Sequence, residues 1–286
     1  MTQISILGCG WLGLPLAKAL LEKGFSVKGS TTSQEKLSVL KNLEIQPFLI
    51  SLESKNVSGN IEGFLENSKI LIIDIPPKLR GNSKEDFVGK IETLIPFIEK
   101  SSIENVLFIS STSVYGDDTS SLDCARDDAL SVTEETIPIA FGTNPETESG
   151  KQLLLAEQLL KSNSNFKNTI LRFGGLIGED RHPVNFLAGC ENLENPEAPI
   201  NLIHQEDCIG IILKIICHTE PVEVWNETFN AVAPFHPSRE EYYTQKAADL
   251  NLALPKFNHE NLSVGKTILN GKIKTILNYT FAKPNL

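Results

Sequence analysis

A glycine-rich segment near the amino terminus has the spacing of a phosphate-binding loop. The segment 8–13 reads GCGWLG and follows the apolar run Ile4–Leu7 at the start of a helical pattern. Gly8 permits a tight turn, Gly10 lets a pyrophosphate approach the backbone, and Gly13 lets the helix pack close to the strand. The N–H groups and dipole of a helix start favour phosphate. The motif therefore predicts a dinucleotide site, and a glycine turn without a ligand is the alternative. The expected cofactor contacts on the loop are Gly8, Gly10, Trp11, Leu12 and Gly13.

The stretch that ends the second expected strand bears on which dinucleotide binds. An acidic residue often stands there, about 20 residues after the loop, and binds the ribose 2′-hydroxyl. Here the stretch 28–33 reads KGSTTS and has no carboxylate. Its hydroxyls could bind a 2′-phosphate, and Lys28 or Lys36 could supply positive charge. The pattern favours NADP over NAD, unless these residues only cap the next helix. The candidate contacts from this stretch are Ser30, Thr31 and Thr32.

Strand and helix patterns alternate through the first 172 residues and position these groups. Apolar strands that alternate with helices indicate a parallel sheet covered on both faces. We therefore expect an α/β fold with a Rossmann-type, doubly wound parallel sheet in residues 1–172. Regular alternation weakens after Arg172, so residues 173–286 are expected to form a smaller C-terminal substrate lobe. The expected strands are Ile4–Leu7, Phe25–Ser30, Ile45–Ile50, Lys69–Ile75, Val106–Ser110 and Thr169–Arg172, and the expected helices are Trp11–Lys23, Gln34–Leu43, Lys84–Glu99 and Lys151–Leu160.

Composition restricts the class of protein and its partners. The 286 residues carry a net charge of −10, which disfavours binding to nucleic acid and to anionic membranes. Five scattered cysteines without a CxxC pair suggest a reduced, cytoplasmic protein without a structural metal site. No apolar run reaches the roughly 18 residues that cross a bilayer, and no signal peptide is expected. We expect no metal, no nucleic acid and no membrane partner.

Seven short motifs, taken together and in order, carry a family resemblance across nearly the whole chain. The chain resembles extended or atypical members of the short-chain dehydrogenase/reductase superfamily, of the nucleoside-diphosphate-sugar epimerase/dehydratase type. Among these it is similar to the bacterial YeeZ-like branch. The resemblance implies an NAD(P)-binding protein and places Ile75 and Pro76 beside the cofactor. The motifs are GCGWLG at 8–13, IDIPP at 73–77, SSTSVYG at 110–116, SGK at 149–151, LRFGGLIG at 171–178, RHP at 181–183 and IHQED at 203–207.

The resemblance also suggests catalytic residues, with one departure. It implies that Ser111, with Thr112 beside it, polarises the substrate and that Lys151 binds the nicotinamide ribose. The family's catalytic tyrosine stands four residues before that lysine, where this chain has Thr147. A threonine hydroxyl has a pKa far above the value of about 10 for a phenol, so it cannot act as the acid/base near neutral pH. Tyr115 is the nearest phenol in the motifs, although the family does not usually use it in this role.

Several of these residues also have a structural interpretation. The cluster 110–113 could close a strand through turn hydrogen bonds, and Lys151 could be an ordinary exposed helix residue. Arg181 and His182 are candidates for a substrate phosphate. His204 is a further substrate candidate or a structural histidine. Asp74 is expected to be buried at a strand end near the cofactor, with no assigned role, and Glu206 and Asp207 fit a helix start.

Two hypotheses for function remain open. The first is an NAD(P)-dependent enzyme that acts on a nucleotide sugar or a related hydroxyl compound by epimerisation, dehydration or oxidoreduction. The second is a sensor or regulatory protein that binds NADP(H) without turnover. Ser111 and Lys151 favour the enzyme, and Thr147 favours the sensor. A small-molecule substrate is expected in the first case, and a homodimer is left open.

Overall fold

The computed structural model describes residues 2–79, 85–116, 130–136, 145, 147–218, 223–260 and 265–286, and it divides into two compact units. One boundary between the units follows Arg172, where the sequence suggests a division, and the chain passes between the units at further points. No helix among the described residues has the length and apolar composition needed to span a membrane. Unit 1 comprises Met1–Ser111, Thr147–Arg172 and Ile209–Phe229, and unit 2 comprises Thr112–Glu146, Phe173–Cys208 and Asn230–Leu286.

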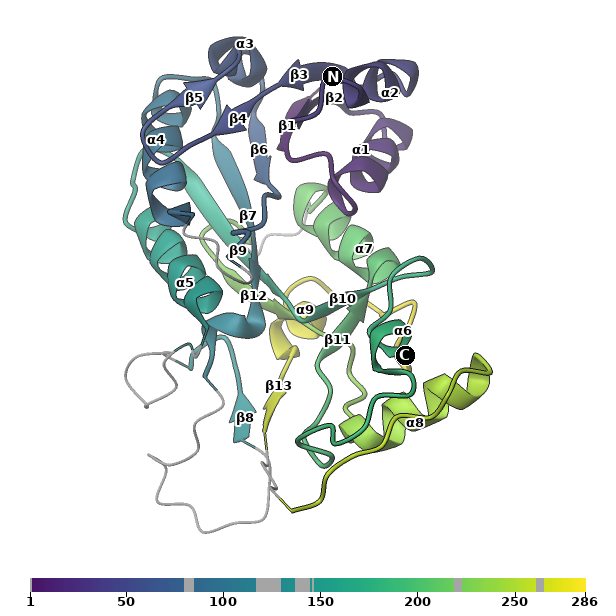
Figure 1. The fold of residues 1–286 in the computed structure, drawn as a ribbon. Helices are drawn as coiled ribbons and strands as arrows, with labels where there is room; N and C mark the ends of the chain where they lie inside the picture. The colour runs from purple at the N-terminus through teal and green to yellow at the C-terminus, as the bar shows by residue number, and fades with distance from the viewer. Residues whose placement is uncertain are drawn as a thin grey trace. The chain divides into compact units, whose positions relative to one another are not determined.

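A seven-stranded sheet confirms the expected Rossmann-type α/β fold (Figure 1). Its strand order is β12-β9-β7-β6-β1-β2-β3, and the five strands from β7 to β3 pair in parallel. The chain builds outward from β1 through β2 to β3, and then returns to add β6 on the other side of β1. The order therefore reverses between β1 and β6, and ligands bind at such a point in doubly wound sheets. The strands are β1 (Gln3–Leu7), β2 (Ser26–Thr31), β3 (Gln46–Leu49), β6 (Ile70–Ile73), β7 (Asn105–Ser111), β9 (Lys167–Phe173) and β12 (Thr228–Ala231).

Helices cover both faces of this sheet. Strand β6 reads ILII and is buried along its whole length, as expected for a strand between two helical layers. In Figure 1, α4 and α5 lie side by side on one face, and α1 lies on the other. Helix α1 buries one stripe of small and aliphatic side chains against the sheet. The helices of the sheet region are α1 (Gly13–Glu22), α2 (Lys36–Asn42), α3 (Ile61–Leu65), α4 (Phe87–Glu99), α5 (Glu148–Lys161) and α7 (Gln205–Ile216), with the short strands β4 (Ser51–Leu52) and β5 (Val57–Ser58).

Unit 2 has a small core of its own. Tyr242 and Tyr243 of α8 pack there with Ile177, Val184 and other buried aliphatic side chains. The carboxylate of Asp207 accepts hydrogen bonds from the Tyr279 hydroxyl and from two backbone N–H groups, at Ala282 and Lys283, and so fixes the C-terminal segment. The elements of unit 2 are η1 (Thr112–Val114), β8 (Leu130–Val132), β10 (Gly175–Ile177), α6 (Val184–Leu187), β11 (Leu202–His204), α8 (Arg239–Asp249), β13 (Lys266–Ile268) and α9 (Gly271–Thr275).

A buried ion pair joins three elements of unit 1. Arg172 of β9 donates to Glu157 of α5 through Nη2, at 2.5 Å, and through Nε, at 3.0 Å. The Ser110 hydroxyl of β7 donates to the same carboxylate at 2.6 Å, and all three residues are at least 95% buried. The sequence suggested that Ser110 could close its strand by a turn hydrogen bond. Instead its hydroxyl bonds to Glu157. It belongs to a polar network inside the core.

The glycines of the loop 8–13 differ sharply in their surroundings. Gly8 has a φ of +111°, and a Cβ on it would lie 2.2 Å from the carbonyl oxygen of Asp74. A Cβ on Gly13 would lie 2.2 Å from the carbonyl oxygen of Gly8. Gly10, by contrast, has no atom of the described residues, apart from its own and its chain neighbours', within 4 Å of its Cβ position. Gly8 and Gly13 are thus required by packing, and Gly10 borders open space.

We expect this difference to appear in stability. Gly13→Ala should lower the free energy of unfolding by about 1–3 kcal/mol, because the new methyl group overlaps a backbone carbonyl. Gly10→Ala should stay within about 0.5 kcal/mol of wild type. Urea denaturation of both variants measures this, and equal effects at the two positions would contradict the loop geometry.

The buried ion pair gives a second stability prediction. Glu157→Ala should lower the free energy of unfolding by about 3–5 kcal/mol, because Arg172 would stay buried without its partner. Glu104→Ala is the control, because Glu104 pairs with Lys69 at the surface, where their side chains are 62% and 50% exposed. Such an exposed pair is worth at most about 1 kcal/mol. The double change Glu157→Leu and Arg172→Met should recover most of the loss. Similar, small losses for Glu157→Ala and Glu104→Ala would show that the buried pair contributes little.

Candidate functional site

A cavity of about 600 Å³ opens in unit 1 at the carboxyl ends of β1, β2 and β6. It lies where the strand order reverses, so the fold and the glycine loop point to the same site. The cavity is lined by Leu7, Gly8, Cys9, Gly10, Ser30, Thr31, Thr32, Lys36, Ile50, Ser51, Leu52, Glu53, Ser54, Asp74, Ile75, Pro76, Lys78, Glu85, Asp86 and Lys90.

The cavity brings together most of the cofactor contacts expected from the sequence. Its wall includes two loop glycines, the hydroxyl-rich end of β2 and the segment after β6. Trp11, Leu12 and Gly13 are not part of the wall and form the turn into α1, where Leu12 is the N-cap residue and makes no side-chain cap. Their role as ligand contacts stays a prediction. The expected contacts that line the cavity are Gly8, Gly10, Ser30, Thr31, Thr32, Ile75 and Pro76.

Hydrogen bonds fix the glycine loop to the end of β2. The Ser30 hydroxyl accepts from Gly8 N at 2.9 Å, and the Ser30 carbonyl accepts from Cys9 N at 2.8 Å. The Thr31 hydroxyl accepts from Ser33 N at 3.1 Å. Helix α2 begins only at Lys36, after an N-cap residue that makes no side-chain cap, so the helix-capping interpretation of residues 30–33 is wrong.

Lys28 does not supply charge to this cavity, contrary to one of the sequence expectations. Its side chain is buried, and Nζ donates to the carbonyl oxygens of Gly63, at 2.8 Å, and Glu66, at 2.6 Å. The ammonium group therefore satisfies backbone carbonyls at the end of α3. Burial lowers the pKa of Lys28. Lys36, the other expected cation, does line the cavity.

Asp74 lines the cavity and contacts the glycine loop. Its carboxylate accepts a hydrogen bond from Gly13 N–H, and its own N–H donates to the Leu7 carbonyl at 2.9 Å. Burial raises the pKa of Asp74 to about 8, against the opposing effect of the Gly13 hydrogen bond. Burial, with the nearby Asp74 charge, also raises the pKa of the Cys9 thiol to about 12. Cys9 is therefore an unreactive thiol, whereas Asp74 changes its charge near neutral pH.

In unit 1 the structure describes two expected catalytic residues, and it explains the residue that replaces the family tyrosine. Thr147 is the N-cap of α5, and its hydroxyl accepts from Gly150 N at 3.0 Å. Lys151 follows one turn later with an exposed side chain, and Ser111 ends β7 partly buried. Thr147 thus has a helix-capping role that a phenol could not take over.

Thr112 and Tyr115, the other catalytic candidates, belong to unit 2. Tyr115 is 1% exposed, and its hydroxyl lies 3.0 Å from Asn230 Oδ1 and 3.1 Å from the Thr133 carbonyl oxygen. Its phenol is therefore held by protein acceptors inside the unit. The sequence alone offered no signal for this arrangement, because the partners are distant in the chain.

The substrate candidates of unit 2 have different surroundings. His182 Nδ1 accepts from Val184 N at 3.1 Å, and Nε2 lies 2.8 Å from the Tyr242 hydroxyl. Burial, aided by the charge of Lys246, lowers the pKa of His182 to about 4. His182 is therefore neutral at pH 7, and its contact with a substrate phosphate stays a prediction.

The other two candidates lie at the edge of elements. The Arg181 side chain is exposed, and its backbone forms an isolated bridge with Gly178. His204 Nδ1 accepts from Glu206 N at 3.2 Å in the first turn of α7, which agrees with a structural histidine. Glu206 and Asp207 do lie in that first turn, as expected.

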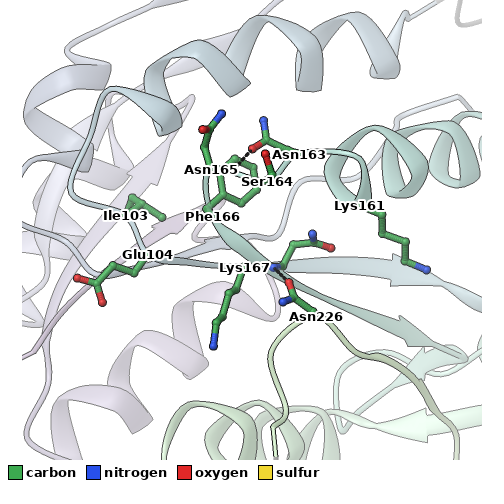
Figure 2. Close-up of a pocket in the computed structure, with 10 residues that line it drawn as sticks. Ile103, Glu104, Lys161, Asn163, Ser164, Asn165, Phe166, Lys167 and Asn226 are labelled. Carbon is green, nitrogen blue, oxygen red and sulfur yellow. Dashed lines mark hydrogen bonds between the residues drawn. The ribbon is translucent and has the colours of Figure 1, made fainter.

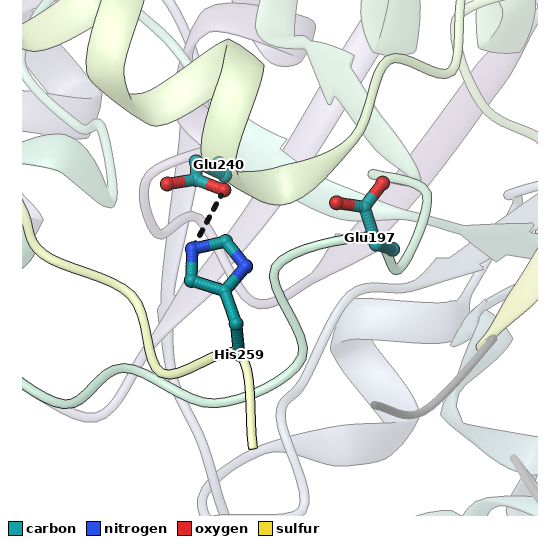
Figure 3. A group of neighbouring side chains, drawn as sticks. All are labelled: Glu197, Glu240 and His259. Carbon is teal, nitrogen blue, oxygen red and sulfur yellow. Dashed lines mark ion pairs between the residues drawn. The ribbon is translucent and has the colours of Figure 1, made fainter. Parts of the chain in front are cut away.

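One group of side chains in the described residues has a composition suited to a metal ion. Glu197, Glu240 and His259 in unit 2 have ligand atoms within 4.8 Å of one another (Figure 3). His259 Nε2 already pairs with Glu240 Oε2 at 3.4 Å, and its side chain is 59% exposed. A surface ion pair accounts for this geometry, so we assign no metal to it.

A second hollow of about 740 Å³ lies at the amino ends of β7 and β9 (Figure 2). Asparagine and lysine side chains dominate its wall, and Asn226 accepts from the backbone of Asn168 at 2.9 Å. None of the expected site residues lines it. The chemistry expected from the sequence is therefore concentrated at the opposite ends of the strands.

Comparisons with known proteins identify relatives of this chain in sequence and in structure. No protein-family model matches the chain. Protein YeeZ of Escherichia coli K12 is 32% identical over 288 residues, which cover 100% of this chain and 97% of YeeZ. UDP-glucuronic acid 4-epimerase from Bacillus cereus, solved in complex with NAD, has a TM-score of 0.75 at 17% identity and covers 98% of this chain and 92% of its own. UDP-glucose 4-epimerase from Thermotoga maritima, solved with UDP-glucose, has a TM-score of 0.73 at 13% identity, with 99% and 94% covered.

These findings confirm the resemblance inferred from the motifs. The structural matches establish the fold, because their sequence identities are low. The match to YeeZ extends over the entire chain at an identity that establishes common ancestry. The chain therefore belongs to the YeeZ family, and it has the fold of the UDP-sugar epimerases.

Proposed function

We propose that this protein binds a nicotinamide dinucleotide in the cavity at the carboxyl ends of β1, β2 and β6. The observation that carries the proposal is the glycine loop itself. Gly8 and Gly13 are fixed by close backbone contacts, whereas the Cβ position of Gly10 is open beside the cavity. A pyrophosphate at Gly10 would meet the start of α1 with its favourable dipole. The NAD bound to the similar B. cereus epimerase supports this assignment.

The end of β2 favours NADP over NAD in this proposal. A 2′-phosphate beside Thr31 and Thr32 would meet hydroxyl groups and the Lys36 ammonium, and residues 28–33 offer no carboxylate to repel it. Ser30 has a different role, because its hydroxyl already accepts a hydrogen bond from Gly8 N. It supports the loop, and Thr31, Thr32 and Lys36 form the selective contacts.

The reaction we propose is epimerisation, dehydration or oxidoreduction of a nucleotide sugar or a related hydroxyl compound. Residues 173–286 would supply the substrate-binding lobe. The UDP-glucose in the similar T. maritima epimerase supports a nucleotide sugar. Ser111 would polarise the substrate, and Lys151 would bind the nicotinamide ribose. The Thr147 hydroxyl caps α5, so the proton transfer must use a different residue.

Dinucleotide binding through the loop is tested by Gly10→Asp. The substitution places a side chain and a negative charge where the pyrophosphate would lie, so NADPH affinity should fall more than tenfold, about 1.4 kcal/mol or more. Gly271→Asp is a matched control, because its Cβ position is also open. Calorimetry on folded protein gives both affinities, and an unchanged affinity in Gly10→Asp would reject the site.

Cofactor selectivity is tested by Lys36→Glu. The substitution removes the proposed contact between the Lys36 ammonium and the 2′-phosphate and puts a negative charge there. NADPH binding should therefore weaken at least tenfold, and NADH binding much less. Lys41→Glu, on the exposed side of the same helix, is the control. Wild-type protein that prefers NADH tenfold, or a Lys36→Glu variant that loses both cofactors equally, would overturn the preference for NADP.

The assignment of the reacting groups is tested by rapid mixing of the cofactor-loaded protein with UDP-glucose or UDP-glucuronic acid. Ser111→Ala and Lys151→Met should each slow the formation of reduced cofactor by about 10²-fold or more. Tyr115→Phe should change the rate less than about threefold, because the hydroxyl is buried among protein acceptors. A large loss only in Tyr115→Phe would move the acid/base to that phenol.

A further inference from the structure

An acidic side chain stands where the proposed ligand carries its negative charge. Asp74 follows β6, lines the cavity and is partly buried. The Cβ position of Gly13 lies 3.0 Å from Asp74 Oδ2, so the carboxylate reaches the backbone at the start of α1. It occupies one of the N–H groups that a phosphate-binding helix start would offer. A pyrophosphate on the loop would therefore lie close to a carboxylate.

The charges around the cavity do not neutralise Asp74 directly. In the described part of the chain, no salt bridge includes this carboxylate. The neighbouring thiol of Cys9 is neutral, because its pKa is raised to about 12. Lys90 already pairs with Glu85. The charged groups that line the cavity are Lys36 from α2, Glu53 from the β4–β5 segment, Lys78 from the segment after β6, and Glu85, Asp86 and Lys90 at the start of α4.

We propose that Asp74 receives the dinucleotide as a neutral carboxylic acid, so that binding of the pyrophosphate is coupled to the binding of one proton. This inference rests on the proposed dinucleotide site. One carboxyl oxygen keeps the Gly13 N–H as its donor. The other oxygen carries the proton, taken from solvent, and donates it in a hydrogen bond toward the ligand. Asp74 is then a positioning residue for the cofactor, and its protonation removes a like-charge repulsion in a buried site.

The titration of the free protein supports this coupling. Burial raises the pKa of Asp74 to about 8, so the acid form is already present at pH 7. An anionic ligand would raise this pKa further. Affinity should therefore be nearly constant below pH 7 and fall toward tenfold per pH unit above pH 8, where the free protein must first gain a proton.

The Asp74 carboxyl also makes the stability of the ligand-free protein depend on pH. The folded-state pKa of Asp74 lies above its unfolded value of 3.8, so the folded chain holds more protons between about pH 4 and pH 8. This contribution to stability is complete below pH 4 and is lost as the pH rises toward 8. Asp74→Asn should remove that part of the pH dependence.

The test is calorimetry with NADH between pH 6 and pH 9.5, in pairs of buffers with different ionisation enthalpies. NADH is the probe because it lacks a 2′-phosphate that would titrate in this range. Wild type should take up close to one proton per NADH at pH 9 and bind at least tenfold more weakly at pH 9.5 than at pH 7. Asp74→Asn should bind with no proton uptake and with the same affinity at both pH values. Glu104→Gln, at an exposed carboxylate that does not line this cavity, should behave as wild type.

The outcomes separate the two proposals. If wild type binds neither NADH nor NADPH at any pH, the proposed function fails. If wild type binds NADH without proton uptake, or Asp74→Asn keeps the wild-type pH profile, the coupling is wrong and the dinucleotide site stands. Should Asp74→Asn fail to fold, carbon NMR of the wild-type carboxyl decides. Its titration midpoint should lie near pH 8 in the free protein and rise by one unit or more with NADH, and an unchanged midpoint overturns the coupling.

Discussion

The site depends on one backbone contact, in which the glycine loop lies directly against the end of β6. A Cβ on Gly8 would lie 2.2 Å from the carbonyl oxygen of Asp74, directly after β6, so Gly8 accepts no side chain without movement. This contact joins the turn after β1 to the turn after β6, and these are the two strands between which the strand order reverses. The cavity and the start of α1 are both positioned by it. Loss of the contact would move every proposed cofactor contact together.

The rest of unit 1 supports that contact at some distance from it. Ser30 fixes the loop to β2 through Gly8 N, and Lys28 fixes the end of α3 from the same strand. The Glu157–Arg172 pair, with Ser110, ties α5 to β9 and β7. Polar side chains of this sheet therefore point mainly to structural partners. Thr31, Thr32 and Lys36 remain at the cavity wall, where a 2′-phosphate would give them a role.

The sequence predicted the features that depend on local pattern. The glycine spacing, the apolar strands and the alternation with helices follow from local geometry, and they located the loop, the sheet and its covering helices. Partners of polar side chains are set by distant segments, and the sequence does not show them. Lys28 seemed available for a phosphate, yet it satisfies carbonyls 35 and 38 residues away. Asp74 had no assigned role, because its closeness to Gly13 exists only after β1 and β6 pair. The neutral state of His182 likewise depends on burial in unit 2 and on the charge of Lys246, which stands far along the chain.

Amide hydrogen exchange tests most directly whether the loop 8–13 binds the dinucleotide pyrophosphate. Exchange is measured on the free protein and with saturating NADPH. We predict slower exchange in residues 8–13, 30–32 and 74–76, which line the cavity or form the start of α1. Segments at the amino ends of β7 and β9 should not change. Unaltered exchange in the loop at saturating NADPH, or protection confined to other segments, would contradict the account.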